Sequence, residues 1–183
     1  MKQTKENHVR FLAVTGLIAG LYTALTLMVA PLSFGPVQCR LSEALTILAV
    51  YTPAAVPGLT LGCAISNLVG LSMGANVAGA LDILLGTVAT GLAAWLTYLL
   101  RRHRLLGLAG LSTIPPVILN ALIVGTELAV VTVPDLTVGG WLFWCGSVGL
   151  GQIIACMGGG LVLAKTIEKT GFQRYLTQNN YTD

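Results

Sequence analysis

The stretch FLAVTGLIAGLYTALTLMVA, residues 11–30, contains no charged side chain. A helix of about 20 apolar residues is the length that crosses the hydrocarbon core of a bilayer. The rest of the chain is similar, since 55% of its residues are hydrophobic and 9% are charged, against roughly 25% charged in soluble domains. These continuous runs lack the alternation of barrel strands, and helices satisfy their backbone in lipid. The sequence therefore predicts an all-α polytopic membrane protein.

Six apolar segments can be drawn along the chain, and no linker or fixed-period repeat divides them. The segments are 9–30, 40–51, 54–71, 79–100, 113–133 and 140–167. Four of them are long enough to span a bilayer, whereas the second and third are short and bracketed by Pro53 and Pro57. We predict one six-transmembrane-helix bundle over residues 9–170, with a cytoplasmic segment at 1–8 and a cytoplasmic tail at 171–183.

The orientation follows from lysine and arginine, which favour the cytoplasmic side of membrane proteins. If the N-terminus is cytoplasmic and the chain crosses six times, Arg40 is the one basic residue that falls outside. The inside set is Lys2, Lys5, Arg10, Arg101, Arg102, Arg104, Lys165, Lys169 and Arg174. Both termini are therefore predicted to be cytoplasmic.

This orientation brings polar residues of five predicted helices to similar depths in the outer half of the membrane. An ionisable side chain at mid-depth costs about 2.5–3.5 kcal/mol or more, so such residues are candidates for a ligand or ion path. A channel would carry polar groups across the full thickness, whereas a half-depth cluster suits capture of a solute from outside. The predicted substrate-binding residues are Gln38, Arg40, Glu43, Asn67, Asp82, Asn120, Glu127, Trp144 and Gln152.

Most of these residues also have a purely structural interpretation. Arg40 and Glu43, three apart on one helix, could neutralise each other, and Asp82 could interact with the helix macrodipole from a first turn. Trp144 could belong to the interfacial aromatic belt. Hydrogen bonding between helices is the alternative for the three amides, which are Asn67, Asn120 and Gln152. Glu127 lacks such an interpretation, because a wholly apolar stretch follows it, and it is favoured as functional.

The charges restrict the ligand. Glu43, Asp82 and Glu127 against Arg40 leave an excess of negative charge, which is costly to bury unless the ligand supplies positive charge or N–H donors. A flat, cationic, donor-rich heterocycle meets this requirement, and an aromatic side chain such as Trp144 could stack on it. The sequence has no phosphate-binding loop, hydrolase triad or metal-ligand spacing. We therefore expect no catalytic residue, no metal and no cofactor in this chain.

Small residues recur every four positions on three predicted helices, a spacing that permits close helix packing in lipid. The stripes are Gly16, Gly20 and Ala24; Gly58, Gly62, Ser66 and Gly70; and Ser147, Gly151, Ala155 and Gly159. The spacing leaves open whether the partner helix belongs to this chain or to another one. The first stripe lies on a helix that carries none of the ligand candidates, which leaves this face free for an external partner.

Several segments resemble the signature of the QueT family of queuosine-precursor transporters. They are LSFGPVQCRLSEALT at 32–46, TPAAVPGL at 52–59, LGC at 61–63, NL at 67–68, LDILLGT at 81–87, PPVILNALIVG at 115–125 and SVGLG at 147–151. The resemblance runs in order from about Tyr22 to Ala164. One position departs from the pattern, because Gln152 stands where the family commonly has Glu.

The resemblance implies the substrate-binding S-component of an energy-coupling factor (ECF) transporter in a prokaryotic plasma membrane. Such a component is a six-helix module that binds a vitamin-like solute from outside. A transmembrane coupling subunit and two cytoplasmic ATPases, which use the ATP, drive it. The matching face for the coupling subunit is Gly16, Gly20 and Ala24. The implied substrate is a queuosine precursor, such as 7-aminomethyl-7-deazaguanine or queuine.

Other classes of function remain open at the level of sequence. A stand-alone secondary transporter for a small cationic heterocycle would need alternating access, usually through inverted repeats and more spans, and neither is visible. An S-component for a different vitamin is a second alternative. An integral membrane enzyme would use Glu43, Asp82 and Glu127 as acid–base groups, but no nucleophile–base pair accompanies them.

Overall fold

The structure of the protein is a computed structural model, which describes residues 2–35, 38–103 and 110–177. Within these ranges every regular element is a helix, and the prediction of an all-α protein is confirmed. In chain order the helices are α1 Lys2–Met28, α2 Ala30–Phe34, η1 Leu41–Val50, α3 Ala55–Ser72, α4 Leu81–Leu99, η2 Leu100–Arg102, η3 Gly110–Thr113, α5 Ile114–Thr132, α6 Val138–Gln152, η4 Ile153–Gly159, α7 Gly160–Thr170 and α8 Gln173–Thr177.

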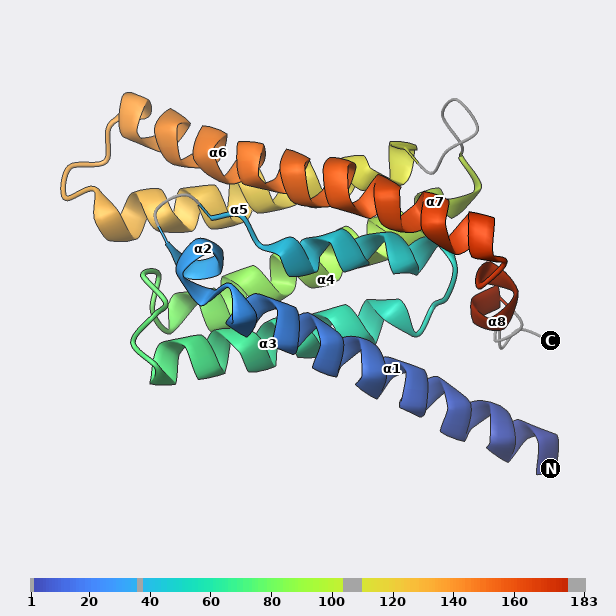
Figure 1. The fold of residues 1–183 in the computed structure, drawn as a ribbon. Coiled ribbons are helices and arrows are strands. Elements are labelled where there is room, and N and C mark those ends of the chain that lie inside the picture. Colours follow the sequence, from blue (N-terminus) through green and yellow to red (C-terminus); the bar gives the residue numbers. More distant parts are fainter. Residues whose placement is uncertain (1, 36–37, 104–109, 178–183) are drawn as a thin grey trace.

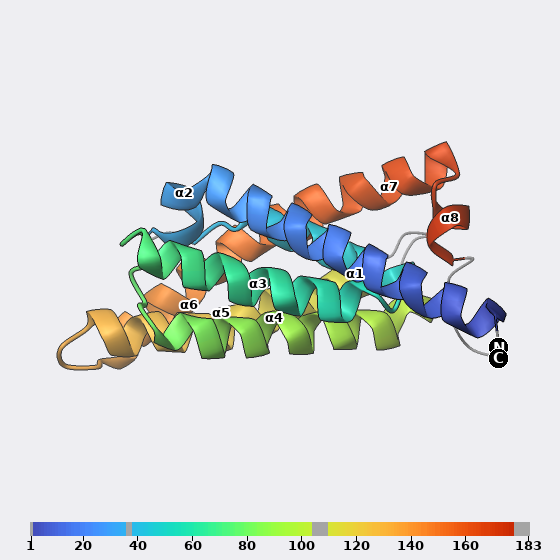
Figure 2. The same ribbon diagram turned by 90° about the horizontal axis from the view of Figure 1, so that it is seen from below.

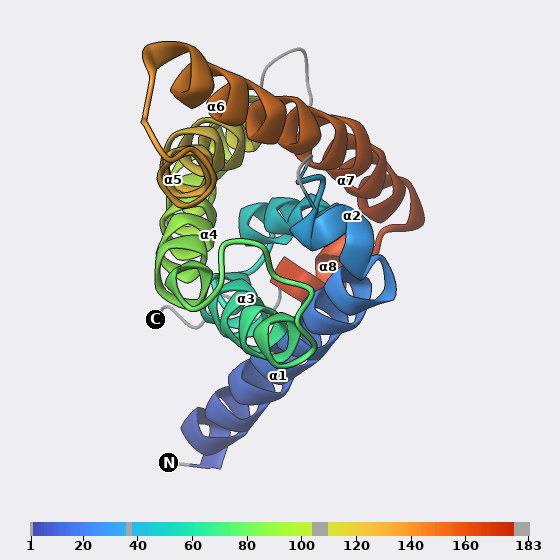
Figure 3. The ribbon, with the colours of Figure 1, turned by 90° about the vertical axis from the view of Figure 1, so that its left-hand side faces the viewer.

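The long helices form an open ring around the helix η1 (Figures 1 and 3). Helices α1, α3, α4, α5 and α6 each pack against the next one in this order. The π-helix η4 joins α6 to α7, so that these three elements make one continuous helix across the bundle. Inside the ring, η1 contacts η4, α7, α4 and α1. The residues that precede and begin η1 are therefore surrounded by other elements.

The interior position of η1 follows from its sequence, LSEALTILAV. Seven of its ten residues are apolar and seven are buried. The polar residues Ser42, Glu43 and Thr46 are buried with hydrogen-bond partners. It is a 3-10 helix, with a rise of about 2.0 Å per residue. Ten residues therefore cover about 20 Å, which is less than the roughly 30 Å of a bilayer core.

Five stretches of helix are long and apolar enough to cross a membrane: Asn7–Met28, Ala55–Ser72, Leu81–Arg102, Gly110–Thr132 and Val138–Thr170. The protein is thus a multi-pass membrane protein, as predicted. The predicted second span is the shorter apolar helix η1, which is not among these five. The six-span count and the cytoplasmic termini stay predictions.

Both chain ends are partly helical, and their predicted boundaries at residues 8 and 170 stay predictions. Helix α1 already begins at Lys2, so the predicted segment 1–8 is continuous with the first span. Part of the predicted tail is helical, since it contains α8. The last residues of that tail, 178–183, lie outside the described residues.

The basic residues and the polar cluster occupy opposite ends of the bundle. The beginning of α1, the short η2, and the end of α7 with α8 share one end, whereas α2 and the α5–α6 connection lie at the other (Figures 1 and 2). The elements at the first end carry the basic residues that were predicted to be cytoplasmic, except Arg104, which lies outside the described residues. This segregation is the pattern that the positive-inside rule requires.

The three small-residue stripes have different surroundings. A Cβ atom added to Gly62 on α3 would lie 2.8 Å from the Cβ of Tyr22 on α1, so the second stripe packs inside the chain. In the third stripe, a Cβ at Gly159 would lie 3.1 Å from the Cβ of Ala44 on η1. A Cβ at Gly16 or Gly20 would meet no atom within 4 Å. The first stripe therefore faces outward.

Candidate solute-binding site

A buried ion pair forms the centre of the polar cluster. Arg40 directly precedes η1 and Asp82 lies in the first turn of α4, and their side chains pair with relative exposures of 4% and 0%. Arg40 also donates through Nε to the carbonyl oxygen of Ser33 at 3.3 Å and lies 5.4 Å above the ring of Phe34. Asn76 donates to Asp82 Oδ2 at 3.0 Å. The pair ties the α2–η1 connection to α4, 42 residues further along the chain.

Glu43 is held by hydroxyl groups. Its carboxylate accepts from Tyr22 Oη at 2.5 Å, from Thr90 Oγ1 at 2.9 Å and from Thr46 Oγ1 at 3.1 Å. These donors come from α1, α4 and η1 itself. The suggested neutralisation of Arg40 by Glu43 is therefore wrong, because Arg40 pairs with the distant Asp82 and Glu43 with three hydroxyl groups.

The thiol of Cys63 on α3 lies between these two groups. Its sulfur accepts from Asn67 Nδ2 at 3.6 Å and from Arg40 Nη1 at 3.7 Å. It also lies 3.4 Å from Thr90 Oγ1, whose single hydrogen is donated to Glu43. Asn67 also donates to the carbonyl oxygen of Asp82 at 2.6 Å. For Asn67, the suggested hydrogen bond between helices is thus present.

Sequence reasoning missed several residues of the cluster, namely Tyr22, Ser33, Cys63, Asn76 and Thr90. Hydroxyl and thiol groups on apolar helices were too ordinary to single out. One signal was available, because Asp82 and Thr90 are eight residues apart on α4 and lie on one face of the helix.

Six buried polar atoms have no hydrogen-bond partner among the described residues. They are Gln38 Nε2, Asn67 Oδ1, Asp82 Oδ1, Thr87 Oγ1, Glu127 Oε1 and Glu127 Oε2. Buried polar groups in native proteins are nearly always paired, so each exception calls for an explanation. Four of the six atoms are pure acceptors. A ligand that brings several N–H donors would satisfy them.

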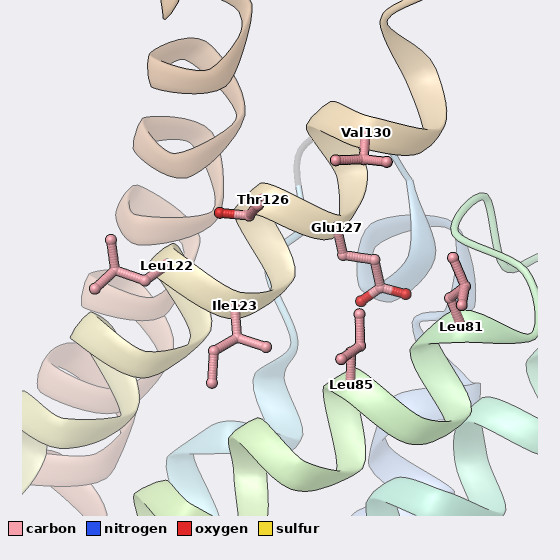
Figure 4. A pocket seen from close by; sticks show the side chains of 7 residues that line it. All are labelled: Leu81, Leu85, Leu122, Ile123, Thr126, Glu127 and Val130. Atoms are coloured by element: carbon pink, nitrogen blue, oxygen red, sulfur yellow. The ribbon is translucent and has the colours of Figure 1, made fainter. Parts of the chain in front are cut away.

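Glu127 stands apart from the other carboxylates. It is 3% exposed, neither of its oxygen atoms has a partner, and it lies close enough to Asp82 and Arg40 to interact with both electrostatically. It also lines a groove of about 350 Å³ between α4 and α5, beside Leu81 and Leu85 (Figure 4). Its carboxylate therefore sits between the polar cluster and this groove.

The remaining candidates are buried or half-buried on α5 and on α6. Asn120 donates to the carbonyl oxygen of Pro116 in its own helix at 2.9 Å, so this bond does not join two helices. Gln152 accepts from Cys156 Sγ at 3.2 Å, again one turn along the same helix. Trp144 packs against the apolar cluster of α4, α5 and α6. Roles in ligand binding for these three residues stay predictions.

The face predicted to contact a coupling subunit is accessible. Gly16, Gly20 and Ala24 are exposed on α1, whereas Tyr22 on the opposite face is fully buried and donates to Glu43. One helix thus presents a small-residue face outward and a site residue inward.

Comparison with known protein families gives a match. The sequence model described as QueT transporter matches residues 12–169, which is most of the chain. No curated protein and no solved structure matches the chain.

Proposed function

This chain belongs to the QueT transporter family, and we propose that it is the substrate-binding S-component of an ECF transporter that takes up a queuosine precursor. One observation carries the proposal: around the Arg40–Asp82 pair, the unpartnered buried atoms are mostly acceptors. A deazaguanine base with an aminomethyl group offers ring N–H groups, an exocyclic amine and an ammonium. It supplies the donors and the positive charge that this cluster lacks.

The positions of the unpartnered atoms support a separate role in ligand binding for each residue. The free oxygen atoms of Asp82 and Asn67 accept from N–H groups of the ring, and Gln38 Nε2 donates to the ring carbonyl. Glu127, with both oxygens unpartnered, binds the aminomethyl ammonium. In this arrangement Arg40 holds Asp82 in place rather than touching the ligand.

The exposed face of α1 supports energisation by other subunits. Glycine at positions 16 and 20 leaves open space over the helix backbone, and close approach of a second helix needs such space. We propose that this face binds a transmembrane coupling subunit, which is driven by two cytoplasmic ATPases.

The test is a binding screen on the purified chain, followed by uptake measurements. Titration with guanine, 7-aminomethyl-7-deazaguanine and queuine should give a deazaguanine that binds at least about 100-fold more tightly than guanine, or about 2.7 kcal/mol. Uptake into vesicles should require the coupling subunit and the ATPases. Absence of binding by every deazaguanine would overturn the substrate class. Ion-driven uptake by the chain alone would instead make it a secondary transporter.

A further inference from the structure

Gly86 lies inside α4 at a position where a side chain would enter the polar cluster. It is buried, and glycine is less favourable than alanine in the interior of a helix. A helical side chain leans towards the turn that precedes it, so a side chain at position 86 would lean towards Asp82, four residues earlier. A Cβ atom added to Gly86 would overlap with Asp82 Oδ1. The absence of a side chain at Gly86 therefore lets the Asp82 carboxylate lie where it does.

Asn67 on α3 borders the same position. The added Cβ atom would lie 2.9 Å from Asn67 Nδ2, which is closer than ordinary van der Waals contact. Asp82 Oδ1 and Asn67 Oδ1 are both buried and have no hydrogen-bond partner among the described residues. Two free acceptor groups from different helices thus lie beside one glycine.

Both side chains are held in place by other hydrogen bonds. Asp82 Oδ2 pairs with Arg40 and accepts from Asn76 at 3.0 Å. Asn67 Nδ2 donates to the carbonyl oxygen of Asp82 at 2.6 Å. Because these bonds fix both side chains, a Cβ atom at position 86 would have to strain them and shift their free oxygen atoms.

We propose that Gly86 is a positioning residue for the ligand. It keeps the free oxygen atoms of Asp82 and Asn67 near each other, and this pair selects bases that carry a ring N–H group next to an exocyclic amine. The inference rests on the proposed function, in which the ring of the ligand donates to these two oxygen atoms. A base without the exocyclic amine leaves one buried acceptor unsatisfied, and a site built for a hydrogen bond strongly rejects such an analogue.

The experiment compares 7-aminomethyl-7-deazaguanine with 7-aminomethyl-7-deazahypoxanthine, which lacks the exocyclic amine, by titration of the purified full chain. The unmodified protein should bind the first base at least about 30-fold more tightly. In Gly86→Ala this preference for the amine should fall to about threefold or less, because the first base loses affinity while the analogue changes little. A role of Gly86 in helix packing alone would weaken both ligands alike and leave their ratio unchanged.

Gly91→Ala is the matched control. Gly91 lies five residues further along α4, and a Cβ atom there would lie 3.0 Å from Thr60 Oγ1 on α3. Thr60 donates to the carbonyl oxygen of Val56 in its own helix at 2.8 Å. This variant crowds the same two helices away from the free oxygen atoms, so it should keep the preference for the amine. Thermal unfolding of both variants shows how much each one destabilises the fold.

Asn67→Ser gives a second test, which also serves if Gly86→Ala does not fold. Its shorter side chain leaves room for Asp82 to move when Gly86→Ala is added. Asn67→Ser alone should keep a preference for the amine of about fivefold, because Asp82 Oδ1 stays in place. Adding Gly86→Ala should remove that remainder.

The outcomes separate this inference from the proposed function. If the unmodified protein binds neither base, the proposed function itself fails. If it binds both bases equally, or if Gly86→Ala keeps the preference for the amine, the inference about Gly86 is overturned and the proposed function stands. The same holds if Gly91→Ala loses the preference to the same extent, or if the double variant keeps the preference of Asn67→Ser.

Discussion

The charged side chains of the site are in three different states. Arg40 and Asp82 pair with each other, and Glu43 is surrounded by hydroxyl donors. Glu127 has no partner among the described residues. A buried carboxylate without a donor is costly. The first three groups are stabilised within the protein, whereas under the proposed function the ammonium of the ligand stabilises Glu127.

The first prediction concerns Glu127. Glu127→Gln should weaken binding of 7-aminomethyl-7-deazaguanine by about 2–5 kcal/mol, the usual cost of removing one partner from a buried charge pair. Binding of 7-methyl-7-deazaguanine, which has no amine, should change much less. Isothermal titration with both ligands measures the difference. Equal losses for the two ligands would assign Glu127 to the ring or to the fold.

Glu43→Gln is the control for that comparison. The Glu43 carboxylate already accepts from three hydroxyl groups, so this variant should lower the thermal stability of the protein without discriminating between the two ligands.

A second prediction concerns the central ion pair. Arg40→Met leaves Asp82 buried without its counter-charge and should lower the free energy of unfolding by about 3–5 kcal/mol. The double variant Arg40→Met with Asp82→Asn should recover part of this loss, because it removes the uncompensated charge. Thermal unfolding in detergent gives both values.

Arg101→Met provides the matched arginine control. Arg101 is only partly buried, donates to the carbonyl oxygen of Tyr98 and stacks on its ring, so its loss should cost less than about 1 kcal/mol. If the double variant Arg40→Met with Asp82→Asn is as unstable as Arg40→Met alone, the loss of stability comes from the contacts of Arg40 with Ser33 and Phe34 and not from the uncompensated charge of Asp82.

Among the helices, α1 separates two kinds of contact on its two faces. Its inner face packs closely on α3, where Gly58 and Gly62 admit the α1 backbone and side chains, and it places Tyr22 against Glu43. Its outer face carries the open stripe. Substrate binding and subunit assembly should therefore respond to different residues of one helix pair.

The third prediction uses this division. Gly20→Leu should leave substrate binding by the isolated chain nearly unchanged, because nothing lies within 4 Å of the added Cβ. It should prevent co-purification with the coupling subunit and ATP-driven uptake, because it fills the contact face. Titration and co-purification of the same variant give the paired readout.

Gly62→Leu is the matched control on the packed face. Its Cβ would lie 2.8 Å from Tyr22, so overpacking should cost about 1–3 kcal/mol of stability. A loss of substrate binding in Gly20→Leu would mean that the outer face of α1 supports the fold, and the coupling assignment would fail.

For the molecule as a whole, the two ends of the bundle are chemically distinct. The elements η2, α7 and α8, which carry basic residues, lie at one end, and α2 and the beginning of α4 lie at the other (Figure 1). If the basic end lies in the cytoplasm, the polar cluster lies in the outer half of the membrane. The exposed leucine, isoleucine and valine side chains along the long helices then face lipid.

The fourth prediction tests this orientation. In a background without the four native cysteines, Asp135→Cys should react with a membrane-impermeant maleimide on intact cells, and His103→Cys should react only after permeabilisation. Both positions are exposed and lie at opposite ends of the bundle, so accessibility of the side chain does not bias the result. The reverse labelling pattern would place the polar cluster on the cytoplasmic side.

The sequence by itself determined the class of protein, the positions of the long helices and most of the charged and amide residues in the apolar interior, but not the hydroxyl and thiol groups beside them. These features can be read from neighbouring residues alone, because they depend on the length of an apolar run and on the position of each polar residue along it. The short length of the segment 40–51 was also predicted, but its 3-10 form was out of reach, because that form goes with contacts to helices that are distant in sequence.

The tertiary structure alone decided which polar groups meet. Arg40 had Glu43 three residues away as a plausible partner, yet it pairs with Asp82 on another helix, and Glu43 takes its donors from Tyr22 and Thr90. It also decided which glycine stripe packs inside and which stays open. These outcomes depend on how helices distant in sequence lie against one another, and hydropathy and residue spacing carry little of that information.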